Sequence, residues 1–221
     1  TLNPSSAASD VYKRQCQLYL ITPARFDLYW FSERLNNALD AGSVACLQLR
    51  LKNAEDDVIK LAVETILPIC HSYQIPLIMN DRPDLAMVTG CDGVHVGQAD
   101  VSYKEARSIM GPDLTVGVTC KNSRHLAVEA AESGAEYVAF GAFFQTETKP
   151  EATPADLKTI QWWNETTTVP SVAIGGIAVD NCKPLIESGT DFLAVIDGVW
   201  NYREGEAAAV KAFNKMFGMY S

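Results

Sequence analysis

Acidic and amide side chains follow two neighbouring apolar runs of this sequence, at the points where the runs end. Asn80 and Asp81 come after one run, and Asp100 follows the next one along the chain. Two converging carboxylates would suit a hard divalent cation such as Mg²⁺, which takes oxygen ligands and keeps several waters. The local alternative makes Asp81 the N-cap of the next helix and Asp100 a turn residue before Ser102. The two acids are therefore a candidate magnesium site, provided that the fold brings them together.

Basic residues near other run ends favour the functional interpretation. Arg50 and Lys52 follow an earlier apolar run, and Lys149 lies in the loop FFQTETK. A divalent cation with a cluster of basic groups is suited to holding a diphosphate and stabilising its departure. The same residue types therefore predict a site for an anionic substrate and magnesium.

Two further features are open to both a functional and a structural interpretation. Gly175 and Gly176 lie between a buried run and a helical segment, where backbone N–H groups could approach a phosphate, although the pair could also serve only a tight turn. His95 could act as an acid or base, but a lone histidine in an apolar run is interpreted as a hydrogen-bonded structural group. Cys120, beside Thr119, has no evident base nearby and is interpreted as incidental.

The elements that would position these residues alternate regularly from Gln17 onward. Short β-rich runs are expected at Gln17–Ile21, Val44–Leu49, Ile75–Met79, Gly93–Val96, Leu114–Val118, Tyr137–Phe140, Ser171–Ile174 and Phe192–Ile196. Amphipathic helices are expected at Phe31–Ala41, Glu55–Tyr73, Asp84–Val88, Tyr103–Met110, Ser123–Ser133, Ala155–Asn164, Val179–Ser188 and Gly205–Met219. Continuous apolar strands separated by helices imply a parallel sheet covered on both faces.

Eight units of a strand followed by a helix, in a chain of this length, predict an α/β fold. We expect a closed (β/α)8 TIM barrel in a single domain rather than an open doubly wound sheet. In that fold the C-terminal ends of the strands form the active face. The polar run endings would then meet on one rim. The glycine pair would also fall after the seventh strand, near the usual phosphate pocket of such barrels.

Composition restricts the partners. The chain has 221 residues, 48% hydrophobic content and a net charge of −9, which argues against a nucleic-acid or anionic-membrane surface. No apolar run approaches the ~20 residues needed to span a bilayer. The six cysteines are scattered without a C-x-x-C pair, so a reducing cytoplasm is expected rather than a disulfide scaffold or zinc site. Small-molecule substrates are the expected partners, and assembly into a homo-oligomer stays open.

Residues 1–15 differ from the rest of the chain. They are polar, lack periodicity and contain no signal-peptide core. DVYKRQ is also what the transposon end sequence used in DNA library preparation encodes in one frame. We expect residues 1–15 to be a non-native or disordered tail, and residues 16–221 to form the catalytic barrel.

The chain from Leu18 to Trp200 resembles the thiamine phosphate synthase family. The matching stretches are QLRLK, NDRPDLA, DGVHVGQAD, VGVT, FGAFFQTETK and VAIGGI, in the family's order and spacing. The resemblance implies a (β/α)8 transferase that joins a pyrimidine diphosphate, 4-amino-2-methyl-5-hydroxymethylpyrimidine diphosphate, to a thiazole phosphate with Mg²⁺. The products would be thiamine phosphate and diphosphate, and which thiazole phosphate variant is preferred stays open.

The resemblance also implies roles for individual residues. Asp81 and Asp100 would be the Mg²⁺ ligands. The pyrimidine diphosphate would be held by Gln48, Arg50, Lys52, Asn80 and Lys149, with Thr119 beside it. The thiazole phosphate would be held by Thr146, Thr148, Gly176, Ile196 and Asp197. Loss of diphosphate leaves a benzyl-like cation, so catalysis by Arg50, Lys52 and Lys149 would consist of neutralising and positioning the leaving group.

Three positions depart from the family pattern. Leu51 stands where a glutamate is usual, Gln145 precedes Thr146 in a loop that often reads P-T-x-T-K, and Asp197 stands where a serine is usual. Asp197 would lose a donor and repel a phosphate dianion, unless its side chain turns away to cap the final helix. Two other functions therefore remain in view: a thiazole tautomerase, which resembles the synthase but needs no diphosphate pocket, and a non-catalytic ligand-binding paralogue.

Overall fold

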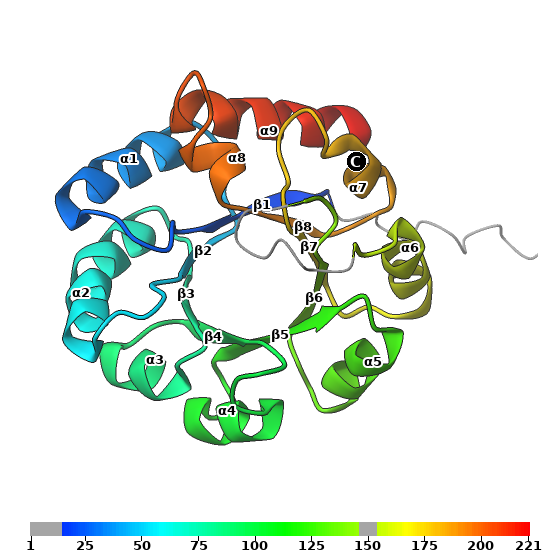
Figure 1. Ribbon diagram of the computed structural model, residues 1–221, viewed down its shortest axis with the longest axis horizontal. Helices are drawn as coiled ribbons and strands as arrows, with labels where there is room; N and C mark the ends of the chain where they lie inside the picture. The colour runs from blue at the N-terminus through cyan, green and yellow to red at the C-terminus, as the bar shows by residue number, and fades with distance from the viewer. Residues whose placement is uncertain (1–14, 146–153) are drawn as a thin grey trace, which may run out of the picture.

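The computed structural model describes residues 15–145 and 154–221 and confirms the closed barrel. Eight parallel strands pair in chain order, and helices surround them (Figure 1). The strands are β1 Gln17–Ile21, β2 Cys46–Leu49, β3 Leu77–Asn80, β4 Gly93–Val96, β5 Thr115–Lys121, β6 Tyr137–Gly141, β7 Ser171–Ile174 and β8 Phe192–Val195. The helices are α1 Leu28–Asp40, α2 Asp56–Ser72, α3 Pro83–Thr89, α4 Tyr103–Met110, α5 Arg124–Glu132, α6 Leu157–Thr166, α7 Lys183–Glu187, α8 Asp197–Trp200 and α9 Glu206–Tyr220.

Side chains of the strands alternate between two cores. In β1, Leu18 and Leu20 belong to the layer between strands and helices, whereas Tyr19 and Ile21 point into the barrel. Both faces of each strand are therefore covered, which is why the strands read as continuous apolar runs. The six cysteines are all buried, and none forms a disulfide bond. This agrees with the expectation from their scattered positions without a C-x-x-C pair.

Element boundaries differ from the expected ones in two informative places. The seventh helix, expected at Val179–Ser188, is only Lys183–Glu187, because the chain before it forms a turn in which Asn181 Oδ1 accepts from the backbone N–H of Ala178. β5 continues to Lys121, beyond the expected end at Val118. Thr119 is therefore part of the strand itself.

The helix expected at Asp84–Val88 forms as α3, with Pro83 in its first turn and Gly90 in the left-handed conformation after its end.

In residues 15–145 and 154–221, no helix is long and apolar enough to cross a membrane. Positions 1–14 of the predicted tail lie outside the described residues, so that prediction stays one.

Gly117 in β5 gives space to the ring of Tyr137, which points into the barrel from β6. A Cβ at position 117 would lie 2.0 Å from Cζ of that ring. Displacement of the ring would disturb its hydrogen bonds, because its hydroxyl group contacts Tyr19 at 2.8 Å and His95 at 2.9 Å. The absence of a side chain at position 117 thus determines where Tyr137 sits.

We expect Gly117→Ala to lower the free energy of unfolding by about 1–3 kcal/mol, the usual cost of overpacking a core. Gly218→Ala is the matched control, since Gly218 lies in α9 and an added Cβ meets nothing within 4 Å. Alanine there should leave stability unchanged or raise it by up to ~1 kcal/mol. Urea unfolding of both variants measures the difference. Equal stability of Gly117→Ala and the wild type would contradict this account of the packing.

Candidate active site

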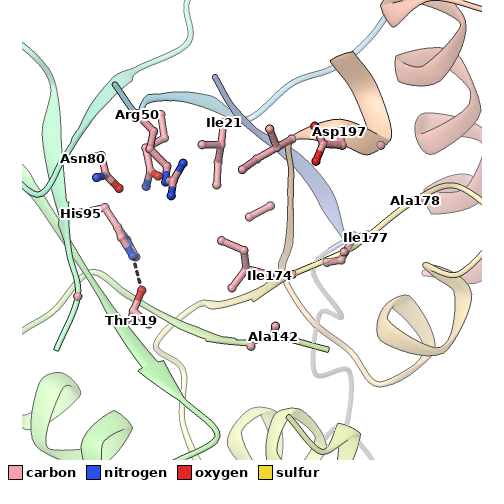
Figure 2. Close-up of a pocket in the computed structure, with 18 of the residues that line it drawn as sticks. Ile21, Arg50, Asn80, His95, Thr119, Ala142, Ile174, Ile177, Ala178 and Asp197 are labelled. Atoms are coloured by element: carbon pink, nitrogen blue, oxygen red, sulfur yellow. Dashed lines mark hydrogen bonds between the residues drawn. The ribbon is translucent and has the colours of Figure 1, made fainter. Parts of the chain in front are cut away.

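A cavity of about 1670 Å³ opens at the C-terminal ends of the strands and collects the residues singled out by the sequence. Figure 2 shows Arg50, Asn80, His95 and Thr119 on one side of it and Ile177, Ala178 and Asp197 on the other. The predicted site residues that line the cavity are Gln48, Arg50, Lys52, Asn80, Asp81, Asp100, Thr119, Gly176, Ile196 and Asp197. Thr146, Thr148 and Lys149 lie outside the described residues, and their roles stay predictions.

The two acids of the predicted magnesium site meet at this rim. Burial, followed by a hydrogen bond with Asp100 and its negative charge, raises the pKa of Asp81 to about 6, and the positive charge of Lys52 acts in the opposite direction. The Asp100 carboxylate also accepts from the backbone N–H of Gly97 at 2.8 Å. A close carboxylate pair with oxygen donors is a reasonable chemical match for a hard divalent cation.

The structure contradicts the local structural role suggested for Asp81 and supports the one suggested for Asp100. The N-cap residue of α3 is Arg82, not Asp81, so the capping interpretation of Asp81 is wrong. Asp81 instead adopts a left-handed backbone conformation with φ of 65°, which is uncommon for a residue with a side chain and is often found at functional sites. Asp100 does close a turn before Ser102, the N-cap of α4, while its carboxylate lies beside Asp81.

Positive charge lies next to the acid pair. Arg50 follows β2 and is partly buried, and that burial lowers the pKa of its guanidinium group, while the negative charge of Asp81 opposes the change. Its backbone N–H donates to Thr22 Oγ1 at 2.9 Å, which ties the end of β2 to the end of β1. Lys52 is exposed two residues later. Arg50, Lys52 and the two acids thus form one compact region of mixed charge.

The opposite side of the cavity is built from the ends of β7 and β8. Gly175 and Gly176 have φ of 104° and 62°, and a Cβ on Gly176 would lie 2.5 Å from the carbonyl oxygen of Gln145. Both the conformation and the close backbone approach require glycine here. These glycines therefore bring bare backbone to the cavity wall.

Asp197 lies on the same side of the cavity as those glycines, after β8, but it does not cap a helix. The N-cap residue of α8 is Ile196, and Asp197 is the first helical residue, so the capping alternative is wrong. Its Oδ1 atom accepts from Nδ2 of Asn201 at 2.9 Å. The side chain is exposed and lines the cavity, so its negative charge faces any anion bound there.

Comparison with known proteins identifies the family of this chain. The family model described as thiamine monophosphate synthase matches residues 18–199. The chain belongs to that family. It is 56% identical over 201 residues to the thiamine-phosphate synthase of Rhodospirillum centenum, covering 91% of this chain and 97% of the relative. It is 45% identical to the enzyme of the same name from Hyphomonas neptunium, with 91% and 93% covered.

A solved structure extends the comparison to three dimensions. Thiamine phosphate pyrophosphorylase from Pyrococcus furiosus superposes with a TM-score of 0.82 at 29% identity, covering 95% of this chain and 98% of that one. As a member of the thiamine monophosphate synthase family, the chain is a transferase enzyme.

Two basic residues that line the cavity were not predicted from the sequence. Lys121 was missed because β5 was expected to end before it, and Arg203 because it lies in the segment after α8. Both add positive charge to the cavity lining. The structural interpretation of His95 is confirmed, since its ring is buried and hydrogen-bonded, but the ring also lines the cavity.

The raised pKa of Asp81 makes a prediction about stability without Mg²⁺. A carboxyl group whose pKa is higher in the folded protein destabilises the fold above about pH 6, and the penalty disappears as pH falls toward the unfolded value of 3.8. In EDTA at pH 8, Asp81→Asn should therefore be more stable than the wild type, by on the order of 1–3 kcal/mol. The difference should vanish near pH 4.

Asp84→Asn provides a control of opposite sign. The hydrogen bonds from Arg82 lower the pKa of Asp84, so its replacement should reduce stability at pH 8 and matter less in acid. Urea unfolding at both pH values measures the two variants. If Asp81→Asn were no more stable than the wild type at pH 8, the electrostatic description of the acid pair would be wrong.

Proposed function

We propose that this enzyme catalyses Mg²⁺-dependent transfer of the 4-amino-2-methylpyrimidin-5-ylmethyl group from its diphosphate to a thiazole phosphate. The products are thiamine phosphate and diphosphate. The observation that carries the proposal is the meeting of an acid pair with Arg50 and Lys52 on one side of a cavity, opposite the backbone at Gly176. Membership of the thiamine monophosphate synthase family supports it.

In the proposed reaction the bond between the pyrimidine methylene carbon and the diphosphate oxygen breaks, and the leaving oxygen keeps the electron pair. The thiazole nitrogen then supplies the electron pair for the new carbon–nitrogen bond. Arg50 and Lys52 bind the diphosphate and stabilise the charge that develops on it. Partial burial strengthens this interaction at Arg50, because charges attract more strongly away from water.

Asp81 and Asp100 are the proposed ligands of Mg²⁺, which would supply further neutralisation of the diphosphate. The elevated pKa of Asp81 supports this assignment, because a bound cation would stabilise a carboxylate that burial and the neighbouring Asp100 destabilise. Asn80 lies at the end of β3 beside the acid pair and is proposed to orient the same substrate. Gly176 and Ile196 are proposed to face the thiazole phosphate.

Asp197 is the one feature that favours a non-catalytic paralogue, because its exposed carboxylate lines the cavity. The tautomerase alternative receives less support, since an isomerase has no need of the acid pair with Arg50 and Lys52. Incubation with both substrates and Mg²⁺ tests the proposal directly. Formation of thiamine phosphate supports the synthase, and failure to form it at any Mg²⁺ concentration rejects that function.

Asp81→Asn and Asp100→Asn should each lower kcat by about 100-fold or more, as removal of other transition-state electrostatic groups does. Steady-state kinetics at limiting Mg²⁺ measure the loss, and a stability measurement confirms that each variant is folded. Wild-type turnover in both variants would refute the metal assignment.

Asp197→Ser should lower the KM of the thiazole phosphate by about two- to tenfold, because it removes a like charge from a solvent-exposed part of the cavity. Asn201→Ala should raise the same KM, since Asp197 would lose the amide that holds its carboxylate. The KM of the pyrimidine diphosphate should change little in either variant. An unchanged thiazole phosphate KM in Asp197→Ser would show that this carboxylate does not face the phosphate.

A further inference from the structure

Five side chains form a continuous hydrogen-bonded path through the barrel interior, below the cavity. Nε2 of Gln48 lies 3.0 Å from the hydroxyl oxygen of Tyr19, which lies 2.8 Å from that of Tyr137. The Tyr137 hydroxyl group contacts Nδ1 of His95 at 2.9 Å, and Nε2 of His95 contacts Oγ1 of Thr119 at 2.7 Å. Figure 2 shows the last of these contacts. The path, called the relay below, joins Gln48 to Thr119, and both line the cavity.

The relay is shielded from water and held by ring contacts. Gln48, His95, Tyr19 and Tyr137 are each less than 9% exposed. The rings of His95 and Tyr137 stack with centroids 5.5 Å apart, and Tyr19 meets Tyr137 edge-on at 5.9 Å. Burial raises the pKa of both tyrosines, so each keeps its hydroxyl hydrogen. Each tyrosine must therefore donate one hydrogen bond inside the protein.

Those hydrogens can be assigned from one end of the relay. The Gln48 amide nitrogen donates to the oxygen of Tyr19. Tyr19 then donates to Tyr137, and Tyr137 donates to Nδ1 of His95. If Nδ1 of His95 carried the hydrogen instead, Tyr137 would donate to Tyr19, and the Tyr19 hydroxyl hydrogen would be left without an acceptor in the relay. In the orientation that the structure gives the Gln48 amide, with Nε2 toward Tyr19, satisfaction of both hydroxyl groups therefore requires an unprotonated Nδ1.

The other end of the relay follows from that tautomer. Neutral His95 carries its hydrogen on Nε2 and donates it to Oγ1 of Thr119. Thr119 accepts through its oxygen, so its own hydrogen can be donated to a ligand in the cavity. Rotation of the Gln48 amide by 180° would reverse every bond and make Thr119 donate to His95. The orientation of the Gln48 amide therefore determines whether the Thr119 hydroxyl group donates into the cavity or to His95.

We propose that Tyr19 and Tyr137 are positioning residues, which fix His95 as the Nε2–H tautomer so that the cavity presents a hydroxyl donor at Thr119 and a set amide orientation at Gln48. The ligand recognised in this way is a nitrogen heteroaromatic ring that carries both an acceptor nitrogen and an amino donor. An aminopyrimidine has that pattern, so this inference rests on the proposed function and assigns the relay to recognition of its pyrimidine substrate.

The tautomer can be measured without any substrate. Two of the three histidines, His71 and His125, have side chains that are 50% and 80% exposed, so the ¹⁵N ring resonances of buried His95 can be assigned by comparison with H71Q/H125Q. In the ligand-free protein we expect His95 to be neutral with the hydrogen on Nε2. In Tyr137→Phe the Nδ1 resonance should move toward that of a nitrogen without a donor. A hydrogen on Nδ1 in the wild type overturns the proposal, whatever reaction the enzyme catalyses.

Kinetics test the assignment to the pyrimidine substrate. Tyr19→Phe and Tyr137→Phe should each raise the KM of the pyrimidine diphosphate by about tenfold, the equivalent of one hydrogen bond, with the thiazole phosphate KM changed less than about twofold. Thr119→Val should have the same selective effect, and Thr119→Ser should restore the wild-type value because it keeps the hydroxyl group. Tyr73→Phe is the matched control, since its hydroxyl group bonds Asp40 outside the barrel and its loss should leave both KM values unchanged.

The combined variant Tyr19→Phe/Tyr137→Phe separates positioning from stability. Removing both hydroxyl groups eliminates two buried donors together and should cost less stability than the single changes suggest. Its pyrimidine diphosphate KM should remain raised. Equal changes in both KM values, or a loss of stability with neither KM changed, would reduce the relay to a structural element. If wild-type enzyme formed no thiamine phosphate, the proposed function would fail while the tautomer measurement still decided the relay.

Discussion

Closure of the barrel imposes the constraint on which the rest of the structure depends: a polar atom inside the ring of strands must find its partner within the protein. In residues 15–145 and 154–221, no buried side-chain nitrogen or oxygen lacks a hydrogen-bond partner. Apolar side chains alone could have filled the interior, just as Leu, Ile and Val side chains fill most of the outer layer between strands and helices. Instead Tyr19 and Tyr137 carry hydroxyl groups to the barrel axis, and those groups need Gln48 and His95 to satisfy them. The polar groups at the floor of the cavity therefore constrain one another, because the donor and acceptor role of each depends on its neighbour.

At the rim above this floor, one charged group lowers the stability of the fold. Burial and the neighbouring Asp100 both raise the pKa of Asp81, and Asp81 holds a backbone conformation that a glycine would adopt more easily. Packing alone would not select either feature. The global charge of −9 would also repel an anionic substrate, so Arg50, Lys52, Lys121 and Arg203 must provide a local positive field. The rim is thus a region where binding chemistry, rather than folding, selects the residues.

The sequence predicted the barrel because its signals are local and repeated. Each strand is an apolar run between helical segments, and the closure of parallel strands places every C-terminal end on one rim, so residues as distant as Arg50 and Ile196 were correctly expected together. The relay was not predictable from the same signals. Tyr19 and Tyr137 read as ordinary members of apolar runs, and the register that aligns them depends on Gly117 and on pairing across the barrel. The capping alternative for Asp197 failed for a related reason, since a shift of one residue separates an N-cap from the first helical position.

The three departures from the family pattern share a physical setting that explains why the fold tolerates them. Leu51 is partly buried against the outer core, where an aliphatic side chain packs in place of a charged one. Gln145 and Asp197 are exposed in segments that follow β6 and β8. None of the three belongs to the relay, in which each group constrains the donor and acceptor state of the next. A change at an exposed position alters one interaction with a ligand, whereas a change in the relay leaves a buried hydrogen or lone pair unsatisfied. The barrel interior therefore restricts sequence through hydrogen-bond satisfaction, whereas the exposed positions after β6 and β8 are restricted less.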